Sequence, residues 1–249
     1  MSILACGMKE IIRKEECTPE RLPAAAIADE VNRSLRENPF LVITAPPGAG
    51  KSTLLPITIL NGLETEGKVL MLEPRRIAAR QIAERMAYLL GEQIGETVGY
   101  RIRFESKVSE MTRIEVLTEG ILTKMISADP TLDGVAAGIF DEFHERSLAS
   151  DLALAMIRES FQAVRPDLRT VIMSATIDAG SICRSLSAPL VESKGRLFPV
   201  EVRHTAEDSV PESCAADVAR AVLGLHRDNE GDILAFLPGE GEIRRCAEL

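Results

Sequence analysis

A glycine-rich turn directly follows a short apolar run near residue 40, and this junction constrains the fold more than any other feature of the chain. Residues 40–43 read Phe-Leu-Val-Ile, and residues 45–52 read Ala-Pro-Pro-Gly-Ala-Gly-Lys-Ser. A buried strand that breaks into such a turn and continues as a helix is the sequence form of a phosphate-binding P-loop. The junction therefore predicts a strand, a phosphate-binding turn and a helix, in that order.

The residue types in this turn suit the phosphates of a nucleotide. Gly48 and Gly50 let the backbone curl so that its N–H groups converge on an anion, at which the following helix points its positive end. Lys51 is expected to reach the β- and γ-phosphates, and the Ser52 hydroxyl to bind Mg²⁺. The usual motif opens with glycine, where this chain has Ala45, a residue small enough to be tolerated. An ordinary Gly/Pro turn is the alternative. The predicted nucleotide-binding residues are Pro47, Gly48, Ala49, Gly50, Lys51, Ser52 and Thr53.

The composition fits an enzyme of the cytoplasm. With 249 residues, 45% of them hydrophobic, the chain has room for one domain and part of another. No apolar run approaches the roughly 18 residues of a membrane span, and residues 3–6 are too short an apolar stretch for a secretion signal. The five cysteines form no C-x-x-C pair, so reduced thiols are expected and a metal site on them is not.

The net charge of −9 does not by itself indicate a nucleic-acid-binding protein. However, residues 200–249 hold 11 Asp or Glu against 5 Arg, so that segment carries −6 and the first 199 residues only −3. A local basic patch in the first part of the chain remains compatible with this balance.

Short apolar runs alternate with helical patterns along the whole chain. The helical patterns include one with Ile77, Ile82, Met86 and Leu89/Leu90 on its apolar face, ended by Gly91. Another has Leu148, Leu152, Ala155 and Met156 on its apolar face and must stop before Pro166. The expected strands lie at residues 40–44, 69–72, 114–118, 135–140, 169–173, 198–202 and 233–237.

Such alternation predicts an α/β fold, a parallel sheet with right-handed crossovers and helices on both faces. Functional residues should then lie beyond the carboxyl ends of the strands. Residues 1–20 lack this patterning, so we expect a loose arm or a short helix there.

A pair of carboxylates ends the apolar run at 135–140. Asp141 is expected to hold Mg²⁺, and Glu142 to orient and deprotonate an attacking water, with Lys51 as the second catalytic residue. An Asp-Glu pair after apolar residues is also common in solvated loops. Its place 90 residues after Lys51, in an alternating chain, favours the catalytic interpretation.

Several short segments, in order and spacing, resemble the motifs of DEAH-box ATP-dependent RNA helicases, and the set is most similar to the bacterial HrpB-type members. The resemblance covers about residues 22–249 and has one departure in motif II, where Phe143 takes the third place. The segments that carry it are Glu73-Pro74-Arg75-Arg76, Gly99-Tyr100-Arg101-Ile102-Arg103-Phe104, Thr118-Glu119-Gly120, Asp141-Glu142-Phe143-His144, Ser174-Ala175-Thr176, Gly195-Arg196-Leu197-Phe198-Pro199-Val200 and residues 233–239.

The resemblance implies roles for further polar residues. Those expected to contact single-stranded RNA, or DNA, are Arg75, Arg76, Arg101, Arg103 and Thr118. Those expected to couple the nucleotide site to strand separation are His144, Ser174 and Thr176. The alternatives are salt-bridged arginines, a helix cap for Thr118, a turn cap for His144 and backbone bonding by the two hydroxyls. With two Tyr and no Trp, no aromatic stacking platform is expected, so contact should be mainly with the strand's backbone.

The resemblance also implies the domain organisation: a RecA-like ATP-binding domain over 21–192 and a partial second RecA-like domain over 193–249. In the second, strands 198–204 and 232–237 would flank a helix over 211–227, leaving apolar surface uncovered. The arginine-rich motif of the family's second domain is missing, so a fragment is expected that binds ATP with Mg²⁺ and hydrolyses it very slowly. The alternatives are a nucleotide-binding module without significant turnover and a P-loop phosphotransferase such as a small kinase.

Overall fold

The protein is described here from a computed structural model that places residues 22–63, 67–175, 179–194, 200–204, 213–228 and 231–249. The chain divides into two compact units, with the boundary between Leu197 and Phe198, five residues after the expected one. The expected amino-terminal arm at 1–20, the coupling residue Thr176 and the motif residues 195–199 lie outside the described residues.

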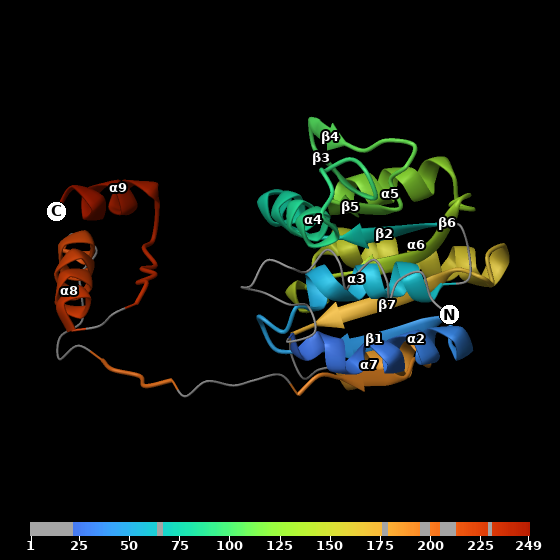
Figure 1. The fold of residues 1–249 in the computed structure, drawn as a ribbon, viewed down its shortest axis with the longest axis horizontal. Helices are drawn as coiled ribbons and strands as arrows, with labels where there is room; N and C mark the ends of the chain where they lie inside the picture. The colour runs from blue at the N-terminus through green and yellow to red at the C-terminus, as the bar shows by residue number, and fades with distance from the viewer. Residues whose placement is uncertain (1–21, 64–66, 176–178, 195–199, 205–212, 229–230) are drawn as a thin grey trace. The chain divides into compact units, whose positions relative to one another are not determined.

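One eight-stranded sheet organises the larger unit (Figure 1). Its strand order is β4-β3-β5-β2-β6-β7-β1-β8, and every neighbouring pair is parallel except β3 and β4, which form an antiparallel hairpin. The five apolar runs expected between residues 40 and 173 all form strands, whereas β3, β4 and β8 were not predicted. The strands are β1 (Phe40–Thr44), β2 (Lys68–Leu72), β3 (Val98–Ile102), β4 (Glu105–Lys107), β5 (Ile114–Leu117), β6 (Val135–Phe140), β7 (Arg169–Ser174) and β8 (Leu190–Glu192).

Alternate strand residues pack into two separate cores, one on each face of the sheet. In β1, Leu41 and Ile43 join the first core, and Phe40 and Val42 join the second. The first core is covered by η2 (Pro23–Ile27), α2 (Ala28–Glu37), α3 (Lys51–Gly62) and α4 (Arg76–Leu90). The second is covered by α5 (Glu119–Ala128), α6 (Leu148–Ala163) and α7 (Ala179–Leu186), and the short η3 (Phe143–Glu145) joins it through Phe143. The predicted α/β sheet with helices on both faces is confirmed.

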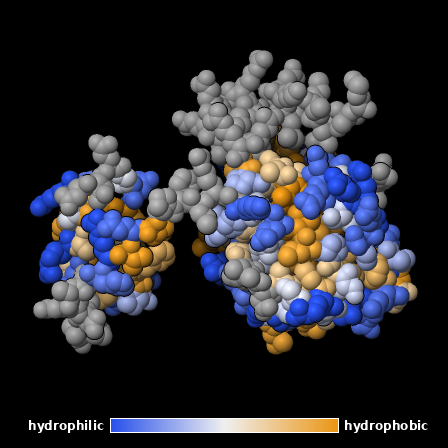
Figure 2. Space-filling model, turned by 90° about the horizontal axis from the view of Figure 1, so that it is seen from below, coloured by the Kyte–Doolittle hydropathy of each residue, from blue (hydrophilic) through white to orange (hydrophobic). Residues whose placement is uncertain are grey.

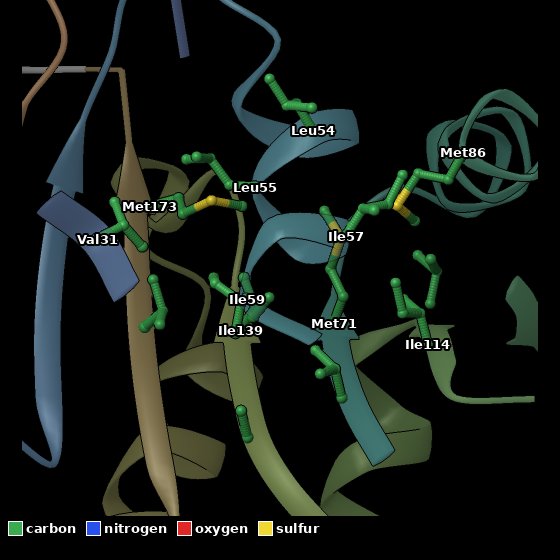
Figure 3. Packing of buried hydrophobic residues seen from close by; sticks show 14 of the residues in the cluster. Val31, Leu54, Leu55, Ile57, Ile59, Met71, Met86, Ile114, Ile139 and Met173 are labelled. Atoms are coloured by element: carbon green, nitrogen blue, oxygen red, sulfur yellow. The ribbon is translucent and has the colours of Figure 1, made fainter. Parts of the chain in front are cut away.

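Helix α3 lies over the middle of the sheet and fixes the position of the P-loop (Figure 3). Leu55 points toward Met173 of β7, and Ile59 lies beside Ile139 of β6. All four side chains are buried, and burying one such side chain stabilises the fold by about 1.5–3 kcal/mol. This packing holds the amino terminus of α3 at the carboxyl edge of the sheet.

The expected apolar faces of α4 and α6 are wrong in part. In α4 only Ile77 departs from the expected face, because it is 75% exposed. Met86 is buried, and Ile82, Leu89 and Leu90 pack against the first core as expected. The three alanines Ala79, Ala83 and Ala87 are buried as well, a contact that a count of large apolar residues does not include.

In α6 the packed face is displaced around the helix by about one residue, which is about 100°. Leu148 is 86% exposed and Leu152 is 48% exposed, whereas Leu154 and Ile157 are buried. No helix among the described residues is long and apolar enough to cross a membrane.

The smaller unit contains two helices, α8 (Cys214–Asp228) and α9 (Glu240–Glu248), which contact each other. The expected strands are wrong in the described residues 200–204 and 232–237, which are not strands. A strand forms only where a neighbour satisfies its N–H and C=O groups, and no described segment pairs with either run. The expected apolar surface is present: Val200, Leu234 and Phe236 are exposed, and Figure 2 shows hydrophobic residues at the surface of this unit.

Two alanine substitutions on α6 test which of its faces is packed. Ile157→Ala should lower the free energy of unfolding by about 2–5 kcal/mol, because it opens a cavity under the sheet. Leu148→Ala, on the opposite and exposed face of the helix, should change the free energy of unfolding by no more than about 0.5 kcal/mol. Denaturant unfolding of both variants measures the difference. Equal losses of unfolding free energy would show that Leu148 is packed, as the sequence predicted.

Candidate functional site

The carboxyl edge of the sheet gathers the predicted functional residues into one row. Along it, the predicted nucleic-acid residues lie at or just after the ends of β3, β5 and β2, and the P-loop, the carboxylates and Ser174 lie at or just after the ends of β1, β6 and β7 (Figure 1). Neighbouring strands lie about 4.8 Å apart, so each set occupies its own half of the edge. Residues just past the strands still bond to the neighbouring strand: Asp141 N–H donates to Leu72 O and Glu73 N–H to Leu117 O, both at 2.9 Å.

The P-loop has the backbone conformation that its glycines predict. Gly48 and Gly50 have φ of 77° and 85°, in the left-handed region that disfavours side chains. A Cβ on Gly50 would also lie 2.7 Å from Leu22 Cδ1. Ala45 takes the place of the usual glycine without conflict, because it is buried and its N–H donates to Ser174 O at 3.2 Å.

The backbone donors of this loop are open. Within the described part of the chain, no acceptor bonds to the N–H groups of Gly48, Gly50, Lys51 or Ser52. Converging N–H groups at the start of a helix form a ready anion site. The predicted loop residues 47–53 therefore lie together, with donors available for phosphate oxygens.

Lys51 lies buried beside the carboxylates of Asp141 and Glu142. Its Nζ is 3.5 Å from Asp141 Oδ1 and is bonded to Glu142 Oε1. Burial by itself lowers the pKa of Lys51, but Asp141 and Glu142 together raise that pKa above its ordinary value. The structure thus brings β1, α3 and β6 together around one ammonium group that stays charged.

Asp141 presents an oxygen without a hydrogen-bond partner to this site. Its side chain is fully buried, and Oδ1 accepts the Glu142 N–H at 2.9 Å. Oδ2 is buried and has no hydrogen-bond partner among the described residues. Burial raises the pKa of Asp141, against the lowering effect of Lys51 and of the Ser52 hydroxyl beside it. Asp141 and Ser52, the two predicted metal ligands, are therefore neighbours.

Glu142 is held in a strained backbone conformation, with φ of 47°. A non-glycine residue there costs on the order of 1–3 kcal/mol, so its neighbours must hold it. The predicted coupling residue His144 lies beside it: its Nδ1 is 3.3 Å from Glu142 Oε2 and 3.5 Å from the Ala175 nitrogen. Nδ1 donates to Glu142 in the tautomer that carries the proton there and accepts the Ala175 N–H in the other, so it makes one of these bonds at a time. His144 thus lies between Glu142 and the end of β7, where Ser174 is buried.

Glu73 is a charged site residue to which the sequence analysis assigned no role. It is only 2% exposed, directly follows β2, and accepts the Arg75 N–H at 3.2 Å. Burial first, and the nearby Asp141 second, raise the pKa of Glu73 to about 7. A carboxylate directly after a buried strand is the same signal that identified Asp141, so the sequence did contain it.

The predicted nucleic-acid residues differ in how free they are. Arg101 follows the salt-bridge alternative: its Nε donates to Glu115 Oε2 at 2.7 Å. Burial alone would raise the pKa of Glu115, but Arg101 and Lys68 lower it below its ordinary value. Arg75 is exposed and paired with Glu145 at 2.7 Å. Within the described part of the chain, neither Arg76 nor Arg103 forms an ion pair.

Thr118 occupies the N-cap position of α5 but makes no side-chain capping bond. The cap alternative is therefore not realised, and Thr118 lies between β3 and β2 on the edge, with its N–H 3.3 Å from Arg101 O.

The chain is similar to bacterial helicases along most of its length. It is 48% identical over 230 residues to ATP-dependent RNA helicase HrpB of Escherichia coli (strain K12), which covers 91% of this chain and 28% of the relative. It is 37% identical over 245 residues to an ATP-dependent RNA helicase HrpA homolog of Haemophilus influenzae, covering 96% of this chain and 19% of that protein. The chain thus spans less than a third of the length of these relatives.

Solved structures agree with this similarity. The crystal structure of Escherichia coli DEAH/RHA helicase HrpB matches 91% of this chain and 29% of that one, with TM-score 0.82 and 47% identity. The crystal structure of E. coli DExH-box NTPase HrpB matches 91% of this chain and 28% of that one, with TM-score 0.74. The family model for DEAD/DEAH box helicases matches residues 26–183, which hold the P-loop, the paired carboxylates and Ser174. The chain therefore belongs to the DEAD/DEAH box helicase family.

Proposed function

We propose that this chain is the ATP- and Mg²⁺-binding core of an ATP-dependent RNA helicase. The observation that carries the proposal is the buried Lys51 between Asp141 and Glu142, beside a loop with open backbone donors. That arrangement supplies a cation, a metal ligand and a base around one phosphate-sized anion site. The relatives whose names specify an ATP-dependent RNA helicase support the substrate and the partner.

Each residue has a distinct task in this proposal. The P-loop N–H groups and Lys51 bind the phosphates, and phosphate oxygens compete with Glu142 for the Lys51 ammonium. Glu142 is then available to orient a water molecule and accept its proton. His144 Nδ1 can bond either to Glu142 or to the Ala175 N–H at the end of β7, and this exchange of partners is its proposed coupling role.

Excess negative charge supports a divalent cation at this site. Glu73, Asp141, Glu142 and Glu145 lie around it, and the raised pKa values of Glu73 and Asp141 reflect that crowding as well as burial. Asp141 Oδ2 and the Ser52 hydroxyl fit Mg²⁺, which takes one or two protein ligands together with phosphate oxygens. The metal supplies charge neutralisation at the phosphates.

Arginines on the other half of the edge support a single-stranded nucleic acid as the partner. Arg76 and Arg103 have no ion pair with described residues, so their guanidinium groups are available to phosphates, and Arg75 is exposed but would have to exchange Glu145 for a phosphate. RNA is the proposed strand, with DNA as the alternative. The free thiols of Cys183, Cys214 and Cys246 agree with a cytoplasmic location.

Replacing the P-loop lysine tests the nucleotide site. Lys51→Ala should weaken Mg²⁺-ATP binding by about 10- to 150-fold, the usual loss for a hydrogen bond to a charged group. Lys124→Ala, at an exposed position on α5, is the matched control and should bind as the wild type does. Calorimetric titration with ATP measures both, and an unchanged affinity in Lys51→Ala would refute the site.

Turnover separates the proposal from a nucleotide-binding module that does not hydrolyse ATP. Any hydrolysis by the purified chain that disappears in Glu142→Gln, with ATP affinity retained, assigns Glu142 as the base. Hydrolysis that survives this change would contradict that role.

The raised pKa of Glu73 predicts a pH dependence of stability. The folded protein keeps this proton up to about pH 7, whereas an ordinary glutamate loses it near pH 4.5. The free energy of unfolding should therefore fall as pH rises from about 4.5 to 7, because the folded state binds more protons over that range. Glu73→Gln should reduce this fall in the nucleotide-free protein.

Denaturant unfolding at pH 5, 6, 7 and 8 measures the effect. Glu84→Gln, at a half-exposed position on α4, shows what a glutamate-to-glutamine change does at the surface. A Glu73→Gln variant with the full wild-type fall would show that other groups cause it.

Salt dependence tests the proposed strand contacts. Each phosphate neutralised on a single strand lowers log affinity by about 0.7 per unit of log salt. Replacing Arg75 and Arg76 together by glutamine should flatten the slope by about 0.7–1.4 for single-stranded RNA. The matched control replaces Arg33 and Arg36 of α2, which are also exposed. Fluorescence anisotropy at several salt concentrations measures the slopes, and an equal change in both pairs would contradict a specific contact.

A further inference from the structure

The tip of the β3–β4 hairpin presents an aromatic ring to solvent. Ile102 pairs with Glu105 in the hairpin register, so Arg103 and Phe104 form a two-residue turn. Phe104 is 89% exposed and belongs to neither hydrophobic core. The ring therefore contributes nothing to the packing of the fold.

The backbone at Phe104 is also in a conformation that is unfavourable for a bulky residue. Its φ is 70°, a conformation that glycine or asparagine adopts easily and a bulky residue does not. Phenylalanine at this position combines backbone strain with an exposed apolar surface. Neither favours folding, so the residue is better explained by a ligand than by the stability of the chain.

A cation already lies against the ring. The guanidinium carbon of Arg103 is 4.7 Å from the Phe104 ring centroid, a cation–π distance. A guanidinium over one face of an exposed ring leaves the other face to a planar partner. Nucleobases are such partners, because every base has a π-face.

Positive charge and apolar surface continue beside the hairpin. A surface hollow of about 510 Å³ lies between the hairpin and α4, lined on its basic side by Arg76, Arg80 and Arg103. Arg80 is paired with Glu84 at 2.9 Å and lies 3.8 Å from Glu105. Arg76 and Arg103 have no such pair among the described residues, which leaves them to bind an anion next to the ring.

The hairpin lies on the nucleic-acid half of the carboxyl edge (Figure 1). Arg101 pairs with Leu117 in the register between β3 and β5, and Thr118 is the next residue of the chain. Phe104 thus follows the outermost parallel strand of the same row that carries Thr118 and Arg75. A strand whose phosphates lie along that row would bring a base to the hairpin tip.

We propose that Phe104 is a stacking platform for one unpaired base of a single-stranded nucleic acid, with Arg76 and Arg103 binding the adjacent phosphates. The inference rests on the nucleic-acid part of the proposed function and adds a base contact to it. It departs from the expectation of no aromatic stacking platform, which rested on the counts of Tyr and Trp and did not consider Phe104. The contact is tolerant of sequence, because stacking does not depend on which base is present.

Binding of two single-stranded RNA oligomers of equal length tests this role, one with all bases and one with abasic ribose at every position. Both carry the same phosphates, so they differ only in the bases. The wild type should bind the base-bearing strand more tightly. Phe104→Ala should weaken binding of that strand by about 5- to 150-fold and leave the abasic strand nearly unchanged, so that the preference becomes smaller or disappears. Phe104→Tyr, which keeps an aromatic ring, should retain the preference.

Tyr88→Ala is the matched control, because Tyr88 is also an exposed aromatic residue with an arginine, Arg85, 5.1 Å from its ring centroid. It lies twelve residues after Arg76 along α4, about 18 Å away, and should bind as the wild type does. Thermal melting of each variant confirms folding.

An equal loss for both strands, or no loss in Phe104→Ala, would overturn the stacking role while the salt-dependent contacts of Arg75 and Arg76 stand. The exposed ring would then be left to a protein contact. Failure of the wild type to bind either strand would refute the nucleic-acid proposal and the stacking role together.

Discussion

The ammonium group of Lys51 is the charge around which the rest of the site is built. A buried cation is tolerated only where carboxylates lie close to it, and here Asp141 and Glu142 provide them from the neighbouring part of the sheet. The pair ties the start of α3 to the end of β6, although the two lie 90 residues apart in sequence. Removing one partner from such a pair leaves a buried charge uncompensated. A phosphate can replace Glu142 as a partner of Lys51 without that penalty, which makes the site receptive to an anion.

The strand order determines which predicted site residues are neighbours along the carboxyl edge. Because β6 lies between β2 and β7, the residues that follow it are adjacent both to Glu73 and to Ser174. Glu73 N–H and Asp141 N–H continue the hydrogen-bond ladder beyond the strands, so these carboxylates are positioned by the sheet rather than by mobile loops. Glu73 thus connects the two halves of the edge: its Oε1 accepts the Arg75 N–H, and its pKa responds to Asp141.

The sequence predicted the parts of the fold that are buried on both sides. The five central strands read as continuous apolar runs, and they formed where expected. The hairpin strand β4 was not predicted, because its residues, Glu105–Lys107, are polar and partly exposed and form no apolar run. At residues 232–237 the error is the reverse, because a strand was predicted and none is present. The run is apolar, but a strand also needs a pairing partner, which composition does not reveal. The packed face of α6 was misplaced, and the buried alanines of α4 were missed, because the sheet that each helix meets decides which of its residues are buried.

The sequence predicts candidate site residues where a particular side chain is needed, and not where a particular backbone conformation is needed. Lys51, Ser52, Asp141 and Glu142 were identified by type and spacing. Their open donors and the orphan Asp141 Oδ2 depend on the fold. Two strained positions show the same limit, because a positive φ at Glu142 or Phe104 has no sequence signature.

Those two residues lie on opposite halves of the carboxyl edge, and their strain is held differently. Glu142 is held by Lys51, by His144 and by its own N–H bond to Asp141 Oδ1, so an anion that draws Lys51 away removes one of its three restraints. Phe104 is held only by the hairpin register and the Arg103 contact, and its ring has no packing to lose. Release of Glu142 therefore depends on the phosphate site, whereas Phe104 is already exposed to a ligand.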